Sequence, residues 1–492
     1  MSHCLEIKGK KIYFLGIAGT GMASVAGLMK EAGYEISGSD GEIYPPMSTM
    51  LKDLGIKVYS PYNPENLNTA KPDVVVVANS LSRGHVEIEH VLANNIPYTS
   101  FPELLGNFVL KDRVTTVVSG THGKTTTTAL LAYVLDQLGE DPGFIIGGIP
   151  KDFSFSFRLG GGRLFAIEGD EYDTAFFDKG SKFLHYFPTY LILNNIEFDH
   201  ADIFPNVEAI EAQFFKVIKL VKNPRNIIAN IDSPRVKALL DRMGLLSQVT
   251  TVAGEGQERD AKIVVTQVVP PAKASQNSRW GASLKSVAWG TMSCETKLFG
   301  RFNIANIAQV VACLQVMEQN AHLKTPLDLE KVRSLIASFS GVKRRLDHLG
   351  ECNGIDVYED FAHHPTAVKS VIEAFKLANP SKRLFVAFEP RNASSRRNVF
   401  QDDFALQLNL ADHVLIGQCF VDKRIPEGQR MDTLALAQSI GPKATSFESN
   451  IDLLSHLVGQ LQPGDSVIFM SCGAFSGIQH RLLKELQEKR FA

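Results

Sequence analysis

The sequence lacks paired cysteines, a dominant charge and any long apolar run. Its six cysteines are scattered over 492 residues without a C-x-x-C pair, which fits neither a disulfide framework nor a cysteine-rich zinc site. Lys and Arg total 51 against 53 for Asp and Glu, so there is no electrostatic reason to expect nucleic acid or an anionic membrane surface as a partner. No window approaches the ~20 apolar residues of a membrane helix, and the N-terminus has no apolar signal region. These absences predict a cytoplasmic protein without membrane insertion.

Length and pattern predict an α/β protein of three units in series. A chain of 492 residues is too long to fold around one hydrophobic core. Short apolar runs alternate with helical patterns, which indicates parallel sheets with crossover helices, whereas residues 261–298, rich in Val, Ser and Thr, predict a small antiparallel insertion. We expect three domains, over residues 1–112, 113–340 and 341–492. No feature of the sequence indicates an oligomeric state.

The most informative motif is a glycine turn between a predicted strand and a predicted helix. It comprises Gly120, Thr121, His122, Gly123, Lys124, Thr125 and Thr126. Such a turn presents unpaired N–H groups and the positive end of a helix dipole to phosphate. Lys124 is then expected on the β- and γ-phosphates, and the Thr125 hydroxyl on Mg²⁺. The motif predicts an ATP-binding P-loop in the central domain, although its first glycine comes later than in the general pattern.

Polar residues follow two further predicted strands of the central region. Residues 168–171 read Glu-Gly-Asp-Glu, and residues 194–200 read Asn-Asn-Ile-Glu-Phe-Asp-His. Because the carboxyl ends of parallel strands meet at one sheet edge, these groups are expected beside the phosphate loop. Glu168 and His200 are therefore predicted to hold Mg²⁺ and, with Lys124, to form the catalytic group.

A second glycine turn opens the first predicted helix. It comprises Gly16, Ala18, Gly19, Thr20 and Gly21. With Asp40 about twenty residues on, the layout is similar to the dinucleotide-binding Rossmann fingerprint, but Ala18 replaces its second glycine and weakens a nicotinamide interpretation. A nucleotide-sugar diphosphate fits at least as well, with pyrophosphate on the helix N-terminus and Asp40 accepting a hydrogen bond from ribose or uracil. Tight-turn packing alone is the alternative.

A basic pair, Arg344 and Arg345, lies just after the second predicted boundary. At a hinge, an arginine is able to move onto the γ-phosphate when the last domain closes, where it stabilises developing charge. A solvated basic face is the alternative interpretation of the same residues.

Five spaced motifs resemble the Mur ligases, the ATP-dependent amide-forming enzymes of bacterial cell-wall synthesis, over nearly the whole chain. They are the phosphate loop, residues 195–200, Gly300-x-x-Asn303-x-x-Asn306, Gly341-Val342-x-x-Arg345 and Asp360-x-Ala362-His363-His364-Pro365. The resemblance implies that Asn303 contacts adenine, Arg345 the phosphates and Asp360 the ribose or γ-phosphate of ATP. It also implies an N-terminal Rossmann-like domain that binds UDP, with Asn79 and Ser80 beside the glycine turn, and a C-terminal Rossmann-like domain for the amine acceptor.

Within the family, four stretches are similar to the branch that acts in peptidoglycan recycling. They are residues 43–49, 79–84, 171–179 and 388–391. The likeness implies that UDP-N-acetylmuramate is joined, through an acyl phosphate, to the tripeptide L-alanyl-γ-D-glutamyl-meso-diaminopimelate. Arg391 and Arg396 are the candidates for binding diaminopimelate.

Three other functions stay open on the sequence. Members that add L-alanine typically have Glu-Ser-Asp where this chain has Glu171-Tyr172-Asp173, and their activity is the first alternative. A nicotinamide-dependent oxidoreductase built on the N-terminal turn is the second, and a nucleotide-regulated binding protein without chemistry is the third.

Overall fold

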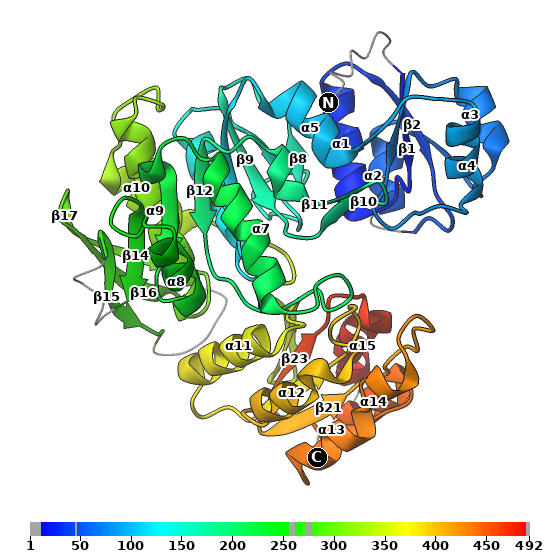
Figure 1. Ribbon diagram of the computed structural model, residues 1–492. Helices are drawn as coiled ribbons and strands as arrows, with labels where there is room; N and C mark the ends of the chain where they lie inside the picture. Colours follow the sequence, from blue (N-terminus) through cyan, green and yellow to red (C-terminus); the bar gives the residue numbers. More distant parts are fainter. Residues whose placement is uncertain (1–10, 45–46, 255–260, 272–277, 489–492) are drawn as a thin grey trace.

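The computed structural model describes residues 11–44, 47–254, 261–271 and 278–488. These residues form three α/β domains in chain order, coloured blue, cyan to green, and yellow to red in Figure 1. None of the helices in this part of the chain is long and apolar enough to cross a membrane. Within the predicted recycling-branch stretch 43–49, residues 45 and 46 lie outside the described residues. The predicted α/β class is confirmed.

The N-terminal domain is built on a parallel sheet with strand order β3-β2-β1-β4-β5. Its elements are β1 Lys11–Leu15, α1 Thr20–Glu31, β2 Glu35–Ser39, α2 Met47–Asp53, β3 Lys57–Tyr59, α3 Pro64–Ala70, β4 Val74–Val77, α4 Val86–Ala93, β5 Tyr98–Ser100, α5 Phe101–Leu105 and the π-helical turn η1 Gly106–Leu110. Strand β4 is four buried valines, as expected for a strand covered on both faces. The first glycine turn follows β1, where the strand order reverses and parallel sheets bind ligands.

The central domain has a mixed sheet with the order β17-β16-β15-β14-β13-β12-β6-β9-β7-β8 among the described residues. Its elements are β6 Val114–Ser119, α6 Lys124–Gln137, β7 Gly143–Ile145, β8 Phe157–Arg158, β9 Leu164–Gly169, β10 Asp173–Ala175, β11 Asp178–Ser181, η2 Lys182–His185, β12 Tyr190–Leu193, α7 Val207–Leu220, η3 Pro224–Asn226, β13 Ile227–Asn230, α8 Pro234–Arg242, β14 Thr250–Gly254, β15 Ile263–Val269, β16 Trp280–Ser286, β17 Gly290–Thr296, α9 Arg301–Gln319 and α10 Leu329–Ser338. Strands β12, β6 and β9 are parallel neighbours, so the segments that follow them meet at one edge.

The predicted antiparallel segment is confirmed, and the structure adds how it is attached. Strands β15, β16 and β17 pair antiparallel with one another. Strand β15 also pairs in parallel with β14, so the segment extends the central sheet. Residues 272–277 of this segment lie outside the described part.

The C-terminal domain has the strand order β18-β19-β23-β20-β21-β22, parallel except for β18. Its elements are β18 Asp347–Cys352, β19 Ile355–Asp360, α11 Pro365–Ala378, β20 Leu384–Phe388, η4 Asn398–Phe400, α12 Gln401–Leu408, β21 His413–Ile416, η5 Glu427–Gln429, α13 Thr433–Ile440, β22 Ala444–Ser446, α14 Asn450–Gln460, β23 Ser466–Met470, η6 Phe475–Gly477 and α15 Ile478–Glu488. As in the first domain, loops after the parallel strands lie at one edge of the sheet.

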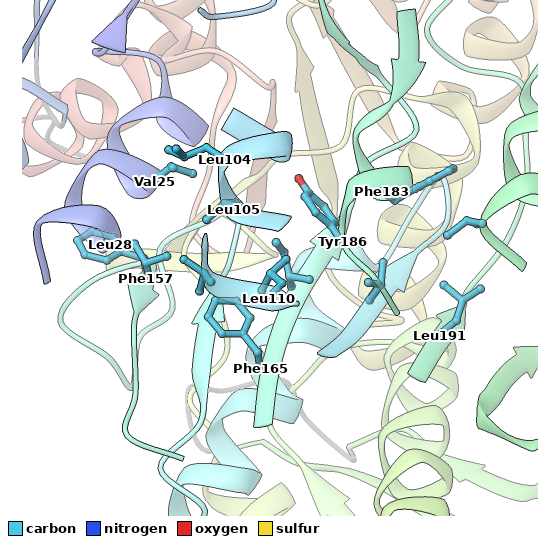
Figure 2. Close-up of a cluster of buried hydrophobic side chains, with 14 of the residues drawn as sticks. Val25, Leu28, Leu104, Leu105, Leu110, Phe157, Phe165, Phe183, Tyr186 and Leu191 are labelled. Atoms are coloured by element: carbon cyan, nitrogen blue, oxygen red, sulfur yellow. The ribbon is translucent and has the colours of Figure 1, made fainter. Parts of the chain in front are cut away.

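One hydrophobic cluster runs from the N-terminal domain into the central domain (Figure 2). It includes Val25 and Leu28 of α1 together with Phe157 of β8 and Phe165 of β9. The approach is so close that a Cβ atom on Gly27 would lie 2.2 Å from the Phe157 ring. These two domains therefore share a core, and α1 is fixed on the central sheet by apolar packing.

Candidate active site

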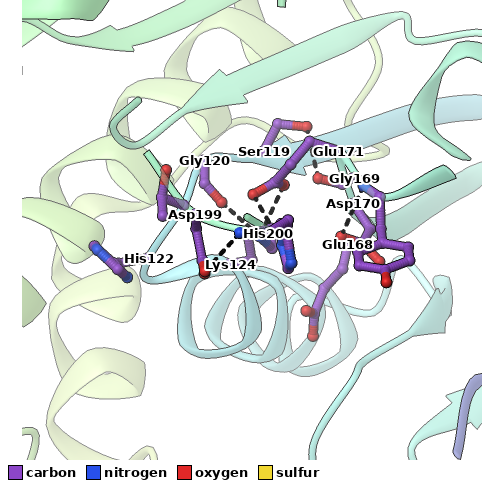
Figure 3. Close-up of polar contacts among 12 residues, drawn as sticks. Ser119, Gly120, His122, Lys124, Glu168, Gly169, Asp170, Glu171, Asp199 and His200 are labelled. Carbon is purple, nitrogen blue, oxygen red and sulfur yellow. Dashed lines mark hydrogen bonds and ion pairs between the residues drawn. The ribbon is translucent and has the colours of Figure 1, made fainter. Parts of the chain in front are cut away.

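The phosphate loop joins β6 to α6 at the carboxyl edge of the central sheet (Figure 3). Its two glycines are required by geometry, because φ is +144° at Gly120 and +83° at Gly123. A Cβ atom on Gly123 would also lie 2.7 Å from the Asn194 side-chain nitrogen. The loop thus packs on the residues that follow β12, and the first turn of α6 points its N–H groups toward the edge where a phosphate would bind.

The side chain of Lys124 is held between two acceptors. Its ammonium donates to the Gly120 carbonyl at 2.6 Å and to the Glu171 carboxylate at 3.0 Å. Burial by itself lowers the pKa of Lys124, but the charges of Glu171 and Asp170 outweigh burial and raise that pKa above its usual value. Lys124 is therefore a fixed positive charge beside the loop.

Thr125 and Glu168 meet an arginine from the C-terminal domain. The Thr125 hydroxyl donates to Glu168 at 3.1 Å, and the Arg345 guanidinium donates to the same hydroxyl oxygen at 3.2 Å. The Gly147 N–H donates to the other Glu168 oxygen. Burial raises the pKa of Glu168, even though this N–H and the charges of Lys124 and Arg345 favour the carboxylate. Three residues predicted from the sequence thus meet across two domains.

His200 lies with two carboxylates, Asp170 and Glu171, in a group whose ligand atoms are within 4.8 Å of one another. Its Nε2 atom is 3.6 Å from a Glu171 oxygen. Burial lowers the pKa of His200, but the hydrogen bond to Glu171 and the charges of the surrounding carboxylates raise it to about 9. Hydroxyl and carboxylate oxygens are the donors that Mg²⁺ prefers, so the donor set of this edge fits that ion. His200 would have to release its proton to act as a ligand.

Glu171 is a site residue that the sequence interpretation did not assign. It is 1% exposed. It accepts a hydrogen bond from Lys124 and lies 3.6 Å from Nε2 of His200. The sequence does contain a signal for this role, because Glu171 is the last residue of the Glu-Gly-Asp-Glu segment that begins with Glu168. Only the fold shows that this carboxylate, not Glu168, contacts the lysine.

His122 belongs to a second group that spans the central and C-terminal domains. Its Nε2 atom lies 3.3 Å from a Glu197 oxygen, and Nδ1 of His364 lies 3.7 Å from that oxygen. The Thr366 hydroxyl donates to the same carboxylate at 2.6 Å. Burial raises the pKa of Glu197, but His122 and Thr366 outweigh it and lower the pKa to about 2. Glu197 is therefore an ionised contact point between the two domains.

Asn303 is buried in the first turn of α9. Its amide donates to the Phe299 carbonyl at 2.7 Å and its oxygen accepts from Asn306 at 3.1 Å. A Cβ atom on Gly123 would lie 2.9 Å from the Asn306 oxygen, so this pair supports the phosphate loop from behind. The adenine contact of Asn303 stays a prediction.

Asp360 ends β19 and holds the turn that carries Arg345. It accepts hydrogen bonds from the N–H groups of Leu346 at 2.6 Å and Ala362 at 2.7 Å. Burial raises its pKa, while the charge of Arg345 acts in the opposite direction. Its contact with ATP also stays a prediction.

The N-terminal glycine turn is fixed by Asp40. The carboxylate accepts from the Ala18 N–H at 2.7 Å and from the Tyr62 hydroxyl at 2.9 Å. The turn lies against the segment after β4, since a Cβ atom on Gly16 would be 2.9 Å from that of Ala78. The predicted residues Gly16, Ala18, Gly19, Thr20, Gly21, Asp40, Asn79 and Ser80 therefore come together at the switch between β1 and β4. Their contacts with UDP stay predictions.

The two predicted peptide-binding arginines lie beside a cavity of about 440 Å³ in the C-terminal domain. Arg396 lines the cavity and pairs with Asp422 at 2.9 Å. Arg391 stacks its guanidinium 4.3 Å from the ring centre of Phe420, another lining residue. Arg430, which the sequence interpretation did not single out, lines the same cavity.

Three Mur ligase family models match the chain in series. They are described as "Mur ligase family, catalytic domain" over residues 11–113, "Mur ligase middle domain" over residues 118–314 and "Mur ligase, glutamate ligase domain" over residues 344–473. Together with the fold and the phosphate loop, they define a three-domain, ATP-dependent ligase. The chain belongs to the Mur ligase family, and the predicted resemblance is confirmed.

Individual relatives cover nearly the whole chain. The UDP-N-acetylmuramate–L-alanyl-γ-D-glutamyl-meso-2,6-diaminoheptanedioate ligase of Escherichia coli is 37% identical over 482 residues, which are 97% of this chain and 99% of that protein. The UDP-N-acetylmuramate–L-alanine ligase of Desulfitobacterium hafniense is 30% identical and covers 94% of this chain and 97% of its own length. A crystal structure of a murein peptide ligase from Psychrobacter arcticus has 32% identity and a TM-score of 0.72, and covers 98% of this chain and 100% of its own.

Proposed function

We propose that the protein joins UDP-N-acetylmuramate to L-alanyl-γ-D-glutamyl-meso-diaminopimelate, with conversion of ATP to ADP, in cytoplasmic peptidoglycan recycling. The domains of residues 1–112, 113–340 and 341–492 bind the sugar nucleotide, ATP and the peptide, respectively. The observation that carries the proposal is the arrangement at the sheet edge, where Lys124 lies between Gly120 and the buried Glu171. The 37% identity to a ligase of that name over nearly the full length supports the choice of acceptor.

The chemistry follows from the poor reactivity of a carboxylate. The lactyl carboxylate of the sugar nucleotide attacks the γ-phosphate of ATP, ADP leaves, and the α-amine of the tripeptide displaces phosphate from the resulting acyl phosphate to form the amide. Attack between two anions requires nearby positive charge. Lys124 and Arg345 supply it from opposite domains, at fixed positions on the Gly120 carbonyl and the Thr125 hydroxyl.

The residues that would hold Mg²⁺ are Thr125, Glu168 and His200. When bound, this ion supplies charge neutralisation at the phosphates. The chain itself places two carboxylates at the loop: the buried Glu171 bonds to Lys124, and the partly buried Glu168 bonds to Thr125. The N–H groups at the start of α6 then orient the phosphate chain.

The cavity near Arg396 is the place for the diaminopimelate end of the acceptor. That end carries both an ammonium and a carboxylate, and the lining offers Arg396 and Arg430 beside Asp422 and Glu448. Arg424 donates to Asp422 at 2.9 Å, and this hydrogen bond raises the pKa of Arg424, with a smaller contribution from the charge of Asp202 in the central domain.

The Tyr172 side chain contacts both Asp202 and His200 in the central domain. Its hydroxyl donates to Asp202, and its ring lies perpendicular to that of His200 with the centres 4.9 Å apart. The L-alanine-adding alternative typically has serine at this position. Tyr172 therefore marks the difference between the two acceptors at the reaction centre itself.

An acceptor panel tests the proposal. Purified protein with ATP, Mg²⁺ and UDP-N-acetylmuramate is given either the tripeptide or free L-alanine, and ADP formation is measured with each. We expect turnover with the tripeptide and little with L-alanine. The reverse preference would establish the alternative, and binding of ATP without turnover under any condition would exclude both.

A further inference from the structure

The loop that carries His200 accepts a hydroxyl contact from the C-terminal domain on both sides of that residue. The Ser394 hydroxyl, in the turn after β20, donates to Asp199 at 2.7 Å and accepts from the Ala201 N–H at 3.3 Å. The same Asp199 oxygen accepts the His200 N–H at 2.7 Å. Ser394 thus contacts the residues on both sides of His200, although it lies nearly two hundred positions away in the chain.

The hydrogen bonds of Ser394 support a strained backbone conformation at His200. His200 has φ +53°, a left-handed conformation that costs a residue with a side chain free energy and persists only where neighbours impose it. Asp199 and Ser394 are 4% and 2% exposed, so water does not compete for their hydrogen bonds. The left-handed turn aims the His200 ring at Glu171.

The C-terminal domain contacts the preceding residue as well. Nε2 of His364 lies 3.0 Å from the Phe198 carbonyl, which accepts, so that nitrogen carries the proton. The rings of Phe198 and Phe400 are 5.8 Å apart. The loop therefore lies between the domains, and Ser394 is the contact that reaches the strained residue.

We propose that Ser394 is a positioning residue: docking of the C-terminal domain sets the backbone of His200 through the Ser394 hydroxyl, so the acceptor-binding domain completes the reaction centre. Ser394 and the predicted peptide-binding residues Arg391 and Arg396 belong to one short turn, in which the Arg391 N–H donates to Ser395 at 3.0 Å. Occupancy of the acceptor cavity is thereby linked to the placement of His200. This inference rests on the proposed function for its kinetic part only.

Ser394→Ala is the test, and Ser395→Ala is its matched control. Ser395 is the next residue and equally buried, but its hydroxyl bonds to Arg391 and Asn392 within its own turn. We expect Ser394→Ala to lower kcat roughly tenfold, as for loss of a hydrogen bond to a charged group, with KM for UDP-N-acetylmuramate unchanged. Ser394→Thr keeps the hydroxyl and restores kcat.

Hydrogen exchange supplies a readout that does not depend on activity. Mass spectrometry of a peptide spanning residues 198–204 should show faster amide exchange in Ser394→Ala than in the wild type or in Ser395→Ala, with the phosphate loop unchanged. Equal exchange and equal kcat in the two alanine variants would overturn the inference. If the wild type is inactive with the tripeptide but Ser394→Ala still exchanges faster than the wild type, the proposed function is overturned. The positioning role of Ser394 is then retained.

Discussion

The two junctions of the central domain differ in chemistry. The junction with the N-terminal domain is largely apolar, with α1 packed on Phe157 and Phe165 in one shared core. The junction with the C-terminal domain has apolar contacts too, such as the rings of Phe198 and Phe400. What distinguishes it is a set of hydrogen bonds at the site, such as Arg345 with Thr125 and Ser394 with Asp199. Apolar burial is non-directional and stabilises a fixed arrangement, whereas hydrogen bonds to charged groups require defined positions of donor and acceptor. The first junction holds the molecule together, and the second assembles the site.

Loss of Lys124 should have the largest effect on turnover. In Lys124→Ala, we expect sugar-dependent ADP release to fall about a thousandfold or more, because a fixed charge at the transferred phosphate is removed. Lys179→Ala is the control, since that ammonium pairs with Asp173 and is 68% exposed. Circular dichroism should show a retained fold. Near-normal turnover would show that the phosphate loop takes no part in the mechanism.

The apolar junction should show the opposite pattern. Phe157→Ala leaves a cavity between α1 and the central sheet, and we expect a loss of about 3 to 5 kcal/mol in unfolding free energy with kcat of the folded fraction retained. Calorimetry and denaturant unfolding measure the first, and steady-state kinetics the second. Phe187→Ala, at a residue that is 51% exposed, should change neither. A large fall in kcat without lost stability would contradict the division between the junctions.

His200, on the loop beside the C-terminal domain, should make the stability of the protein depend on pH. The pKa of His200 is raised to about 9, above the ~6.5 of an unfolded histidine. Its stabilising contribution is therefore fully present below about pH 6.5 and is lost as the pH rises through 9. The neighbouring carboxylates Asp170, Glu171 and Asp199 stay ionised over this window, because their pKa values are lowered.

The measurement is the stability gap between wild type and His200→Gln as a function of pH. We expect this gap to shrink by up to about 3 kcal/mol between pH 6 and pH 9.5. The gap between wild type and Phe157→Ala should stay constant over the same range, because no titrating group lies in that packing. A constant gap for His200→Gln would show that its charge does not stabilise the folded protein.

The acceptor cavity should give the smallest effect, confined to one substrate. We expect Arg430→Ala to raise KM for the diaminopimelate tripeptide about tenfold, the cost of one hydrogen bond to a charged group. KM for a tripeptide ending in lysine, which lacks the distal carboxylate, should not change. Arg397→Ala is the control, because its side chain bonds to Gln429 and does not line the cavity. Equal changes with both peptides would place the carboxylate elsewhere.

Local sequence determined the strands and the phosphate loop. The apolar runs over residues 11–15, 227–230, 384–388 and 466–470 are strands in the structure, because short apolar runs between polar turns specify buried strands by themselves. The phosphate loop from Gly120 to Lys124 is also recognisable in the sequence, because its glycines, lysine and threonine lie at fixed spacing within one short segment. Short strands such as β7 and β18 have no comparable apolar run, because they form only where a neighbouring strand offers hydrogen bonds.

Contacts between distant residues were decided by the tertiary structure. The sequence put Glu168 and His200 near the loop but did not show that Glu171 takes the Lys124 ammonium, or that Ser394 supports His200. Side chains separated by tens to hundreds of positions meet only when sheet order and domain packing are fixed, and no local pattern encodes that distance. The sequence thus specified which chemical groups are present and on which loops, while the fold chose their partners and, through burial, their charge states.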